Sequence, residues 1–187
     1  MANSDNPNGF TPVRHMSGGT IRANEYLIES GETTAIFSGD LVTLEADGYI
    51  EQADATDVNI VGVFGGVEYT ATDGSVVFKN NWVASTTTLG SNDVKAFVYD
   101  DPSIVYSAQH DGTMTTAMNG SAFDVVVAAG SATNGRSSME VDTSSASATS
   151  GQLKQVGLIN KTGNATGANA EVEVIINEHL LKQEGAH

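Results

Sequence analysis

The chain has 187 residues, no cysteine and a formal net charge of −15, from 23 acidic against 8 basic residues. A chain of this length fits one domain and buries roughly 70% of its unfolded surface without a covalent staple. The lack of cysteine excludes disulfides, thiolate metal sites and thiol catalysis, and it suits a reducing cytoplasm. We expect no nucleic-acid partner, because phosphate binding depends on lysine and arginine. We also expect no membrane partner, since no apolar run approaches the ~20 residues of a membrane span.

The N-terminal segment, residues 1–19, differs in composition from the rest of the chain. It carries two prolines and three glycines but hardly any side chains that form a core. Pro12 restricts the residue before it to extended conformations, and glycine raises the entropy of the free chain. Asp5 is the only acid that precedes the two arginines Arg14 and Arg22. We therefore predict an extended arm over residues 1–19, mobile by itself and ordered by a partner outside the monomer.

Beyond the arm, short runs rich in β-branched and aromatic residues follow one another, separated by turn signals such as Asp47-Gly48 and Asp73-Gly74. The predicted strands lie at 20–30, 41–45, 48–53, 59–70, 75–80, 94–100, 103–108, 123–129 and 171–177. No long window has helical periodicity, and only short helices are expected, near 115–118 and within 177–183. The predicted fold class is mainly β, a single β-barrel or β-sandwich body over residues 20–187.

Residues 130–151 form a second stretch of low complexity, dominated by small polar side chains. A linker between two domains is one interpretation, but only about 36 residues follow, too few for an independent core. We therefore expect a polar loop excursion at about 130–151 on the surface of the body. A further long loop is expected at 160–170.

The residues that carry chemistry are scattered. The acidic loop 45–57 lacks the spacing of a calcium loop, so a hairpin with solvated carboxylates is preferred. His110 and Asp111 are the residue types of an acid–base pair, but an Asp-Gly turn with an exposed neighbour is the simpler interpretation. No two of the four histidines share a metal-ligand spacing, and no nucleophile motif occurs. We expect no enzyme activity, no metal site and no cofactor.

Trp82 is the only tryptophan of the chain, and polar residues surround it in the sequence "KNNWVASTTT". Such a side chain is a candidate anchor at an interface between proteins. The alternative, left open by the sequence, is a tryptophan at a strand end that covers the edge of the core.

Three stretches together resemble a family of tailed-phage virion proteins. They are "PNGFTPVRHMSGGTIR" (7–22), "VKAFVYDDPSIVYSAQHDGT" (94–113) and "GQLKQVGLINKTGNATGANAEVEVIINEHLL" (151–181). Members of this family, common in marine and cyanobacterial phages, coat the capsid as cement or decoration proteins. The stretch 38–66 is more faintly similar to the lambda-type head-decoration proteins, which form trimers.

The resemblance implies that the arm is a strap that binds the capsid. The family patterns "GF-x-P-x-R-H" and "G-G-x-I-R" are matched here by Phe10, Pro12, Arg14, His15, Ile21 and Arg22. Phe10 is expected to fill a small pocket of the capsid, and the two arginines to pair with capsid carboxylates. The alternative for both arginines is a pairing with the acidic body of the same chain.

The function that the resemblance implies is that of a capsid cement protein on the outer surface of the mature phage head. Its expected partners are the major capsid protein and further copies of itself, with a homotrimer favoured and a homodimer at a two-fold as the alternative. It would be made in the cytoplasm of the host bacterium and end in the virion. A component of the phage tail or neck is the second candidate. A receptor- or glycan-binding module is a third class, which the small number of aromatic residues disfavours.

Overall fold

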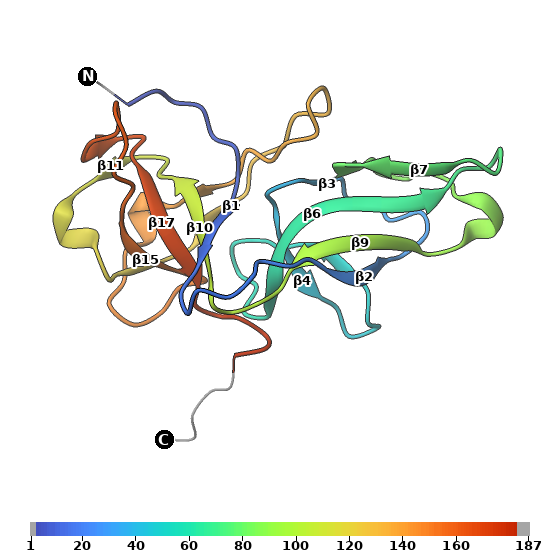
Figure 1. The fold of residues 1–187 in the computed structure, drawn as a ribbon, viewed down its shortest axis with the longest axis horizontal. Helices are drawn as coiled ribbons and strands as arrows, with labels where there is room; N and C mark the ends of the chain where they lie inside the picture. The colour runs from blue at the N-terminus through green and yellow to red at the C-terminus, as the bar shows by residue number, and fades with distance from the viewer. Residues whose placement is uncertain (1–2, 183–187) are drawn as a thin grey trace.

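The computed structural model describes residues 3–182, and these form a mainly β protein built from several antiparallel sheets. Two larger sheets lie side by side in Figure 1, one on each side of the molecule. No sheet within residues 3–182 closes on itself, so the body is sandwich-like and not a barrel. The mainly β fold class predicted from the sequence is confirmed.

The first sheet combines the N-terminal strand with strands from the second half of the chain. Its order is β1 (Thr11–His15), β10 (Ile104–Gln109), β17 (Glu171–Ile176), β15 (Leu153–Leu158) and β12 (Ala122–Phe123). All its pairs are antiparallel. The alternation predicted for the last strand is present: Val172, Val174 and Ile176 are buried, and the residues between them are partly exposed.

The second sheet is formed by the chain between β1 and β10. Its order is β2 (Asn24–Ile28), β9 (Val94–Tyr99), β6 (Ile60–Thr70), β4 (Leu41–Leu44) and β5 (Ile50–Gln52), with β7 (Val76–Lys79) paired to the far half of β6. The strand β6 is long enough to pair with β4 near its start and with β7 near its end. The second sheet is therefore an insertion between two neighbouring strands of the first (Figure 1).

Smaller elements complete the body. Three two-stranded pairs are β3 (Ile36–Phe37) with β8 (Asn81–Trp82), β11 (Thr113–Met114) with β16 (Gly167–Ala168), and β13 (Val125–Val126) with β14 (Glu140–Val141). Single 3-10 turns are η1 (Leu89–Ser91), η2 (Thr116–Met118) and η3 (Thr143–Ser145). The short helix expected near 115–118 corresponds to η2. The helix expected within 177–183 is not formed by residues 177–182, which are turn and bend apart from a single bridge between His179 and Ile60, and residue 183 lies outside the described residues.

Two apolar clusters make the core. The first lies against the five-stranded sheet but includes Leu41 and Val63 from the six-stranded sheet. The second lies against the six-stranded sheet and contains Phe64 from β6 and Trp82 from β8. Because the first cluster takes residues from both sheets, buried apolar contacts join the two halves of the body.

The segment 130–151 is not only the surface excursion predicted from the sequence but also contributes to the core. Met139 and Val141 are fully buried in the first cluster, so part of the segment crosses the core. Arg136 forms a bridge with Ser38, and the carbonyl oxygen of Gly135 accepts a hydrogen bond from the Ser38 N–H (3.1 Å). The segment therefore ties the two sheets together. The sequence does not indicate this role, because two buried apolar side chains among twenty-two residues leave no periodic pattern.

Candidate functional site

The N-terminal segment is part of the body in the structure and not a separate arm. Phe10 is 1% exposed and packs in the first core cluster, and its N–H donates to the carbonyl oxygen of Gly39 (2.8 Å). A side chain at Gly9 would approach that same carbonyl oxygen to 2.5 Å, which explains a glycine with a φ of +64°. For residues 3–19, the predicted division into a mobile arm and a body is therefore corrected. Phe10 fills a pocket of its own chain.

The strand β1 holds this segment on the five-stranded sheet. It pairs with β10 from Thr11, opposite Ser107, to His15, opposite Ile104, with an irregularity in register between Pro12 and Arg14. Proline lacks a backbone N–H, so it is tolerated only where a strand has one free side or a bulge. As the outermost strand of this sheet, β1 provides both conditions. The extended conformation that Pro12 imposes on Thr11 is therefore that of a paired edge strand and not that of a free arm.

Arg14 makes the alternative pairing that the sequence left open. Its Nε and Nη2 atoms donate to the Glu173 carboxylate of β17, with the shortest contact at 2.6 Å. The hydrogen bond to Glu173 raises the pKa of Arg14, and the charge of Glu173 adds to the effect. Arg22 is exposed, and within residues 3–182 no carboxylate forms an ion pair with it. The two arginines therefore differ: Arg14 belongs to its own acidic body, and Arg22 is available to a partner.

His15 organises the turn that follows β1. Its Nε2 atom lies 3.0 Å from Oδ2 of Asp101, and its Nδ1 atom accepts hydrogen bonds from the N–H groups of Ser17 and Gly19. Nδ1 is thus an acceptor and Nε2 a donor. The N–H of Ser103 and then the His15 contact lower the pKa of Asp101. The motif residue His15 has a structural role that its own contacts account for.

Between β1 and β2 the chain forms an exposed loop over residues 16–23, which we call the N-terminal loop. Every residue in it is exposed except Ile21, which packs partly buried against the first core cluster. Met16 and Arg22 are its largest exposed side chains, and Val13 is exposed on the adjoining strand. Of the six residues in the family patterns, only Arg22 is both charged and free of partners within residues 3–182.

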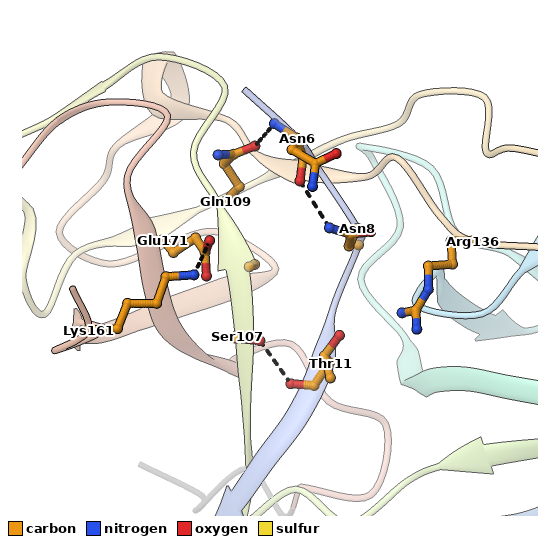
Figure 2. A pocket seen from close by; sticks show the side chains of 10 residues that line it. Asn6, Asn8, Thr11, Ser107, Gln109, Arg136, Lys161 and Glu171 are labelled. Carbon is orange, nitrogen blue, oxygen red and sulfur yellow. Dashed lines mark hydrogen bonds and ion pairs between the residues drawn. The ribbon is translucent and has the colours of Figure 1, made fainter. Parts of the chain in front are cut away.

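A polar groove of about 510 Å³ lies beside the start of the same segment. Figure 2 shows its labelled side chains on both sides of the N-terminal strand: Asn6, Asn8, Thr11, Ser107, Gln109, Lys161 and Glu171, with Arg136 across from them. Gln109 is the central contact, because its Oε1 accepts from the N–H of Asn6 (3.0 Å) and its Nε2 donates to two carbonyl oxygens. Lys161 and Glu171 form an ion pair that lies on one side of the N-terminal strand in Figure 2.

The chemistry of this groove is hydrogen bonding, without a pair of groups arranged for proton transfer. Lys161 and Glu171 neutralise each other, and the remaining labelled side chains apart from Arg136 are amides and hydroxyls. Within residues 3–182, no three histidine or carboxylate side chains gather closely enough to hold a metal ion. In the same part of the chain, no helix has the length and hydropathy needed to cross a membrane.

His110 is buried and does not pair with the carboxylate of Asp111. Its Nε2 atom lies 2.8 Å from Oε1 of Gln155 and its Nδ1 atom 3.1 Å from Oγ1 of Thr143, while Asp111 accepts from the Thr143 N–H. Burial lowers the pKa of His110. The exposed position expected beside the Asp-Gly turn is therefore wrong, and the histidine ring packs edge-on against Phe123 in the core.

Trp82 lies in the core and is not an exposed interface anchor. Its side chain is 0% exposed, its ring meets Tyr69 edge-on at 5.8 Å, and its Nε1 atom donates to the carbonyl oxygen of Glu32 (3.3 Å). The second interpretation, a tryptophan that covers the core from a strand end, describes its place on β8. The sequence could not decide between the two interpretations, because β8 is only two residues long and shows no alternating pattern.

The titration of Glu140 makes the stability of the fold depend on pH. Partial burial, together with the carboxylates of Asp5 and Asp111, raises the pKa of Glu140 to about 7. A raised carboxyl pKa in the folded state contributes stability that is complete below the ordinary glutamate value and is lost as the pH rises through about 7. We expect the melting temperature to fall between pH 5 and 8, and to fall less in Glu140→Gln. Thermal melts across this range check it, with Glu25→Gln as the control; equal slopes for all three proteins would contradict it.

No family model, no curated protein and no solved structure matches this chain. The likeness to phage virion proteins therefore rests on the three quoted stretches alone.

Proposed function

We propose that this protein is a virion structural protein that binds the outer surface of a mature phage head as a cement, or decoration, protein. The observation that carries the proposal is the ordered likeness of 7–22, 94–113 and 151–181 to the tailed-phage family, which spans nearly the whole chain. A net charge of −15 supports the outer surface, because a head packed with DNA repels an acidic body. In this role the protein has no catalytic activity and needs no cofactor.

The capsid contact falls on the N-terminal loop in this proposal. Phe10, Arg14 and His15 are engaged within the chain, so they position the loop and do not themselves reach the capsid. Met16 and Arg22 remain exposed, next to Val13 on the edge strand β1. An arginine beside apolar side chains suits a capsid surface that offers a carboxylate and an apolar contact.

In the proposed role, the N-terminal loop of each bound copy makes one weak contact with the capsid, and many copies bind one capsid. A protein that binds only the assembled lattice stabilises that lattice by mass action, and each contact can be modest when hundreds of copies bind. The partners are the major capsid protein and further copies of this chain. The protein is made in the cytoplasm of the host bacterium and is carried on the outside of the capsid.

The test is co-sedimentation of purified protein with capsids stripped of it. We expect saturable binding by the unchanged protein and about tenfold weaker binding by Arg22→Glu, since a tenfold loss corresponds to about 1.4 kcal/mol at an interface. Arg136→Glu, the same charge change on an exposed arginine elsewhere, is the matched control. A deletion of the whole segment is unsuitable because it removes Phe10 from the core.

The outcomes separate the competing roles. Equal binding by all three proteins would keep the capsid role and remove the N-terminal loop as its contact. Absence of binding by the unchanged protein would overturn the capsid role and favour the alternative, a tail or neck component. Electron microscopy of the purified protein would then show rings or tubes and not small closed oligomers.

A further inference from the structure

One edge of the six-stranded sheet carries exposed apolar side chains that the proposed capsid contact does not use. Among the described strands β7 pairs with β6 alone, and Figure 1 shows it at the rim of this sheet. Val76 is 59% exposed and Phe78 is 68% exposed, the highest value for a large apolar side chain within residues 3–182. A strand edge with exposed apolar residues is a place where another strand adds to a sheet.

The backbone of β7 shows which of its groups are free. At the start of the hairpin the N–H of Ala71 donates to the carbonyl oxygen of Ser75 (2.8 Å). In an antiparallel pair, positions bonded to the neighbouring strand alternate with positions whose N–H and C=O point away from it. Ser75 and Val77 therefore face β6. Val76 and Phe78 direct their backbone groups to the free side of the strand.

The stretch of β7 whose backbone groups are free ends at Asn80. At Asn80 the carbonyl oxygen accepts a hydrogen bond from the N–H of Ser38 (2.9 Å), and the next two residues pair with β3. The edge therefore has room for a strand about as long as β7 itself, which is four residues.

We propose that β7 binds β7 of a second copy of this chain, in an antiparallel pair about a two-fold axis at Val77. In this register Val76 of each copy lies opposite Phe78 of the other. These are the residues with free backbone groups, so each of the two pairs closes backbone hydrogen bonds in both directions. A β-branched residue opposite an aromatic one is also a favourable cross-strand pair. Lys79 of each copy lies opposite Ser75 of the other, so the two Lys79 side chains do not face each other.

Charge favours a second copy over other partners. At −15 per chain, two copies repel each other over most of their surfaces. Residues 74–92 contain Lys79 as their only charged residue, so two copies meet here without placing carboxylates against each other. A strongly charged partner of another kind would lack charged groups to pair with at this edge.

The inference is independent of capsid binding and concerns the purified protein. Strand pairing about a two-fold axis closes after two copies. It therefore supports the homodimer, the alternative drawn from the sequence, over the homotrimer, which rested on the lambda-type resemblance.

Sedimentation equilibrium gives the first test. We expect the unchanged chain to form dimers, and Phe78→Glu to weaken dimerisation by about 30-fold or more, the loss typical of one central interface side chain. Leu27→Glu is the matched control, because Leu27 is 44% exposed on β2, at another edge of the same sheet. Thermal melts verify that both variants fold. A monomer, a trimer, or equal losses from the two variants would overturn the proposal.

A single cysteine tests the register. The chain has no cysteine, so Val77→Cys introduces the only thiol. On the two-fold axis, position 77 faces itself at a Cα separation of about 4.5 Å, which a disulfide spans. We expect mild oxidation to link Val77→Cys into dimers and to link the control Phe78→Cys far less, because position 78 faces 76. Equal linking of the two, or no linking at 77, would overturn the proposed pairing.

Discussion

Replacing Phe10 with alanine is expected to lower the free energy of unfolding by about 3–5 kcal/mol, the usual cost of removing a buried aromatic side chain. The phenyl ring is buried in the first core cluster, where it packs with residues of both larger sheets. Its loss leaves a cavity that the paired strand β1 prevents from closing. Urea denaturation followed by far-ultraviolet circular dichroism measures the difference.

Met16→Ala is the control for the Phe10 prediction. Met16 is exposed and lies six residues further on in the same segment, so its truncation is expected to change stability by less than about 0.5 kcal/mol. If Phe10→Ala cost as little as the control, the N-terminal segment would be detached in solution. The mobile arm predicted from the sequence would then be the correct description.

Most strands could be predicted because each is a local pattern. The run 171–177 alternates apolar and acidic residues up to Val174, and Val172, Val174 and Ile176 are buried in β17. All nine predicted runs contain strand residues in the structure. The strand β1 was missed because proline, glycine and polar residues surround it, and its pairing with β10 joins positions about ninety residues apart. Only long-range contacts distinguish such an edge strand from a free arm.

The candidate site residues were harder to predict than the strands. Arg14 and Glu173 are 159 positions apart, so the sequence left the partner of the arginine open. The family pattern includes His15 without indicating a partner, whereas the contacts of His15 with Asp101 and with the turn after it explain its place. In both cases the fold supplies the partner. What the sequence did indicate is the contrast between an N-terminal segment with a single acidic residue and a strongly acidic body, and the Arg14–Glu173 ion pair joins the two.

Trp82→Ala, like Phe10→Ala, removes a buried aromatic side chain and is expected to lower the free energy of unfolding by about 3–5 kcal/mol. The indole is fully buried, and its edge-on contact with Tyr69 adds to the area that it buries. Trp82→Phe should cost less, because the carbonyl oxygen of Glu32 keeps a second donor, the N–H of Ser85 at 2.7 Å. Circular dichroism must follow these melts, since the chain has no other tryptophan.

The fluorescence of Trp82 in the unchanged protein distinguishes a core position from an interface position. A buried indole emits at short wavelength and resists quenching by iodide, at every protein concentration. An interface anchor would become exposed to iodide on dilution, as the oligomer dissociates. We expect quenching to stay low when the dimer is diluted, because Trp82 packs against the second core cluster and the proposed pairing lies at Val76 and Phe78. Quenching that rises with dilution would show that Trp82 lies at the interface between copies, and that β8 forms this contact.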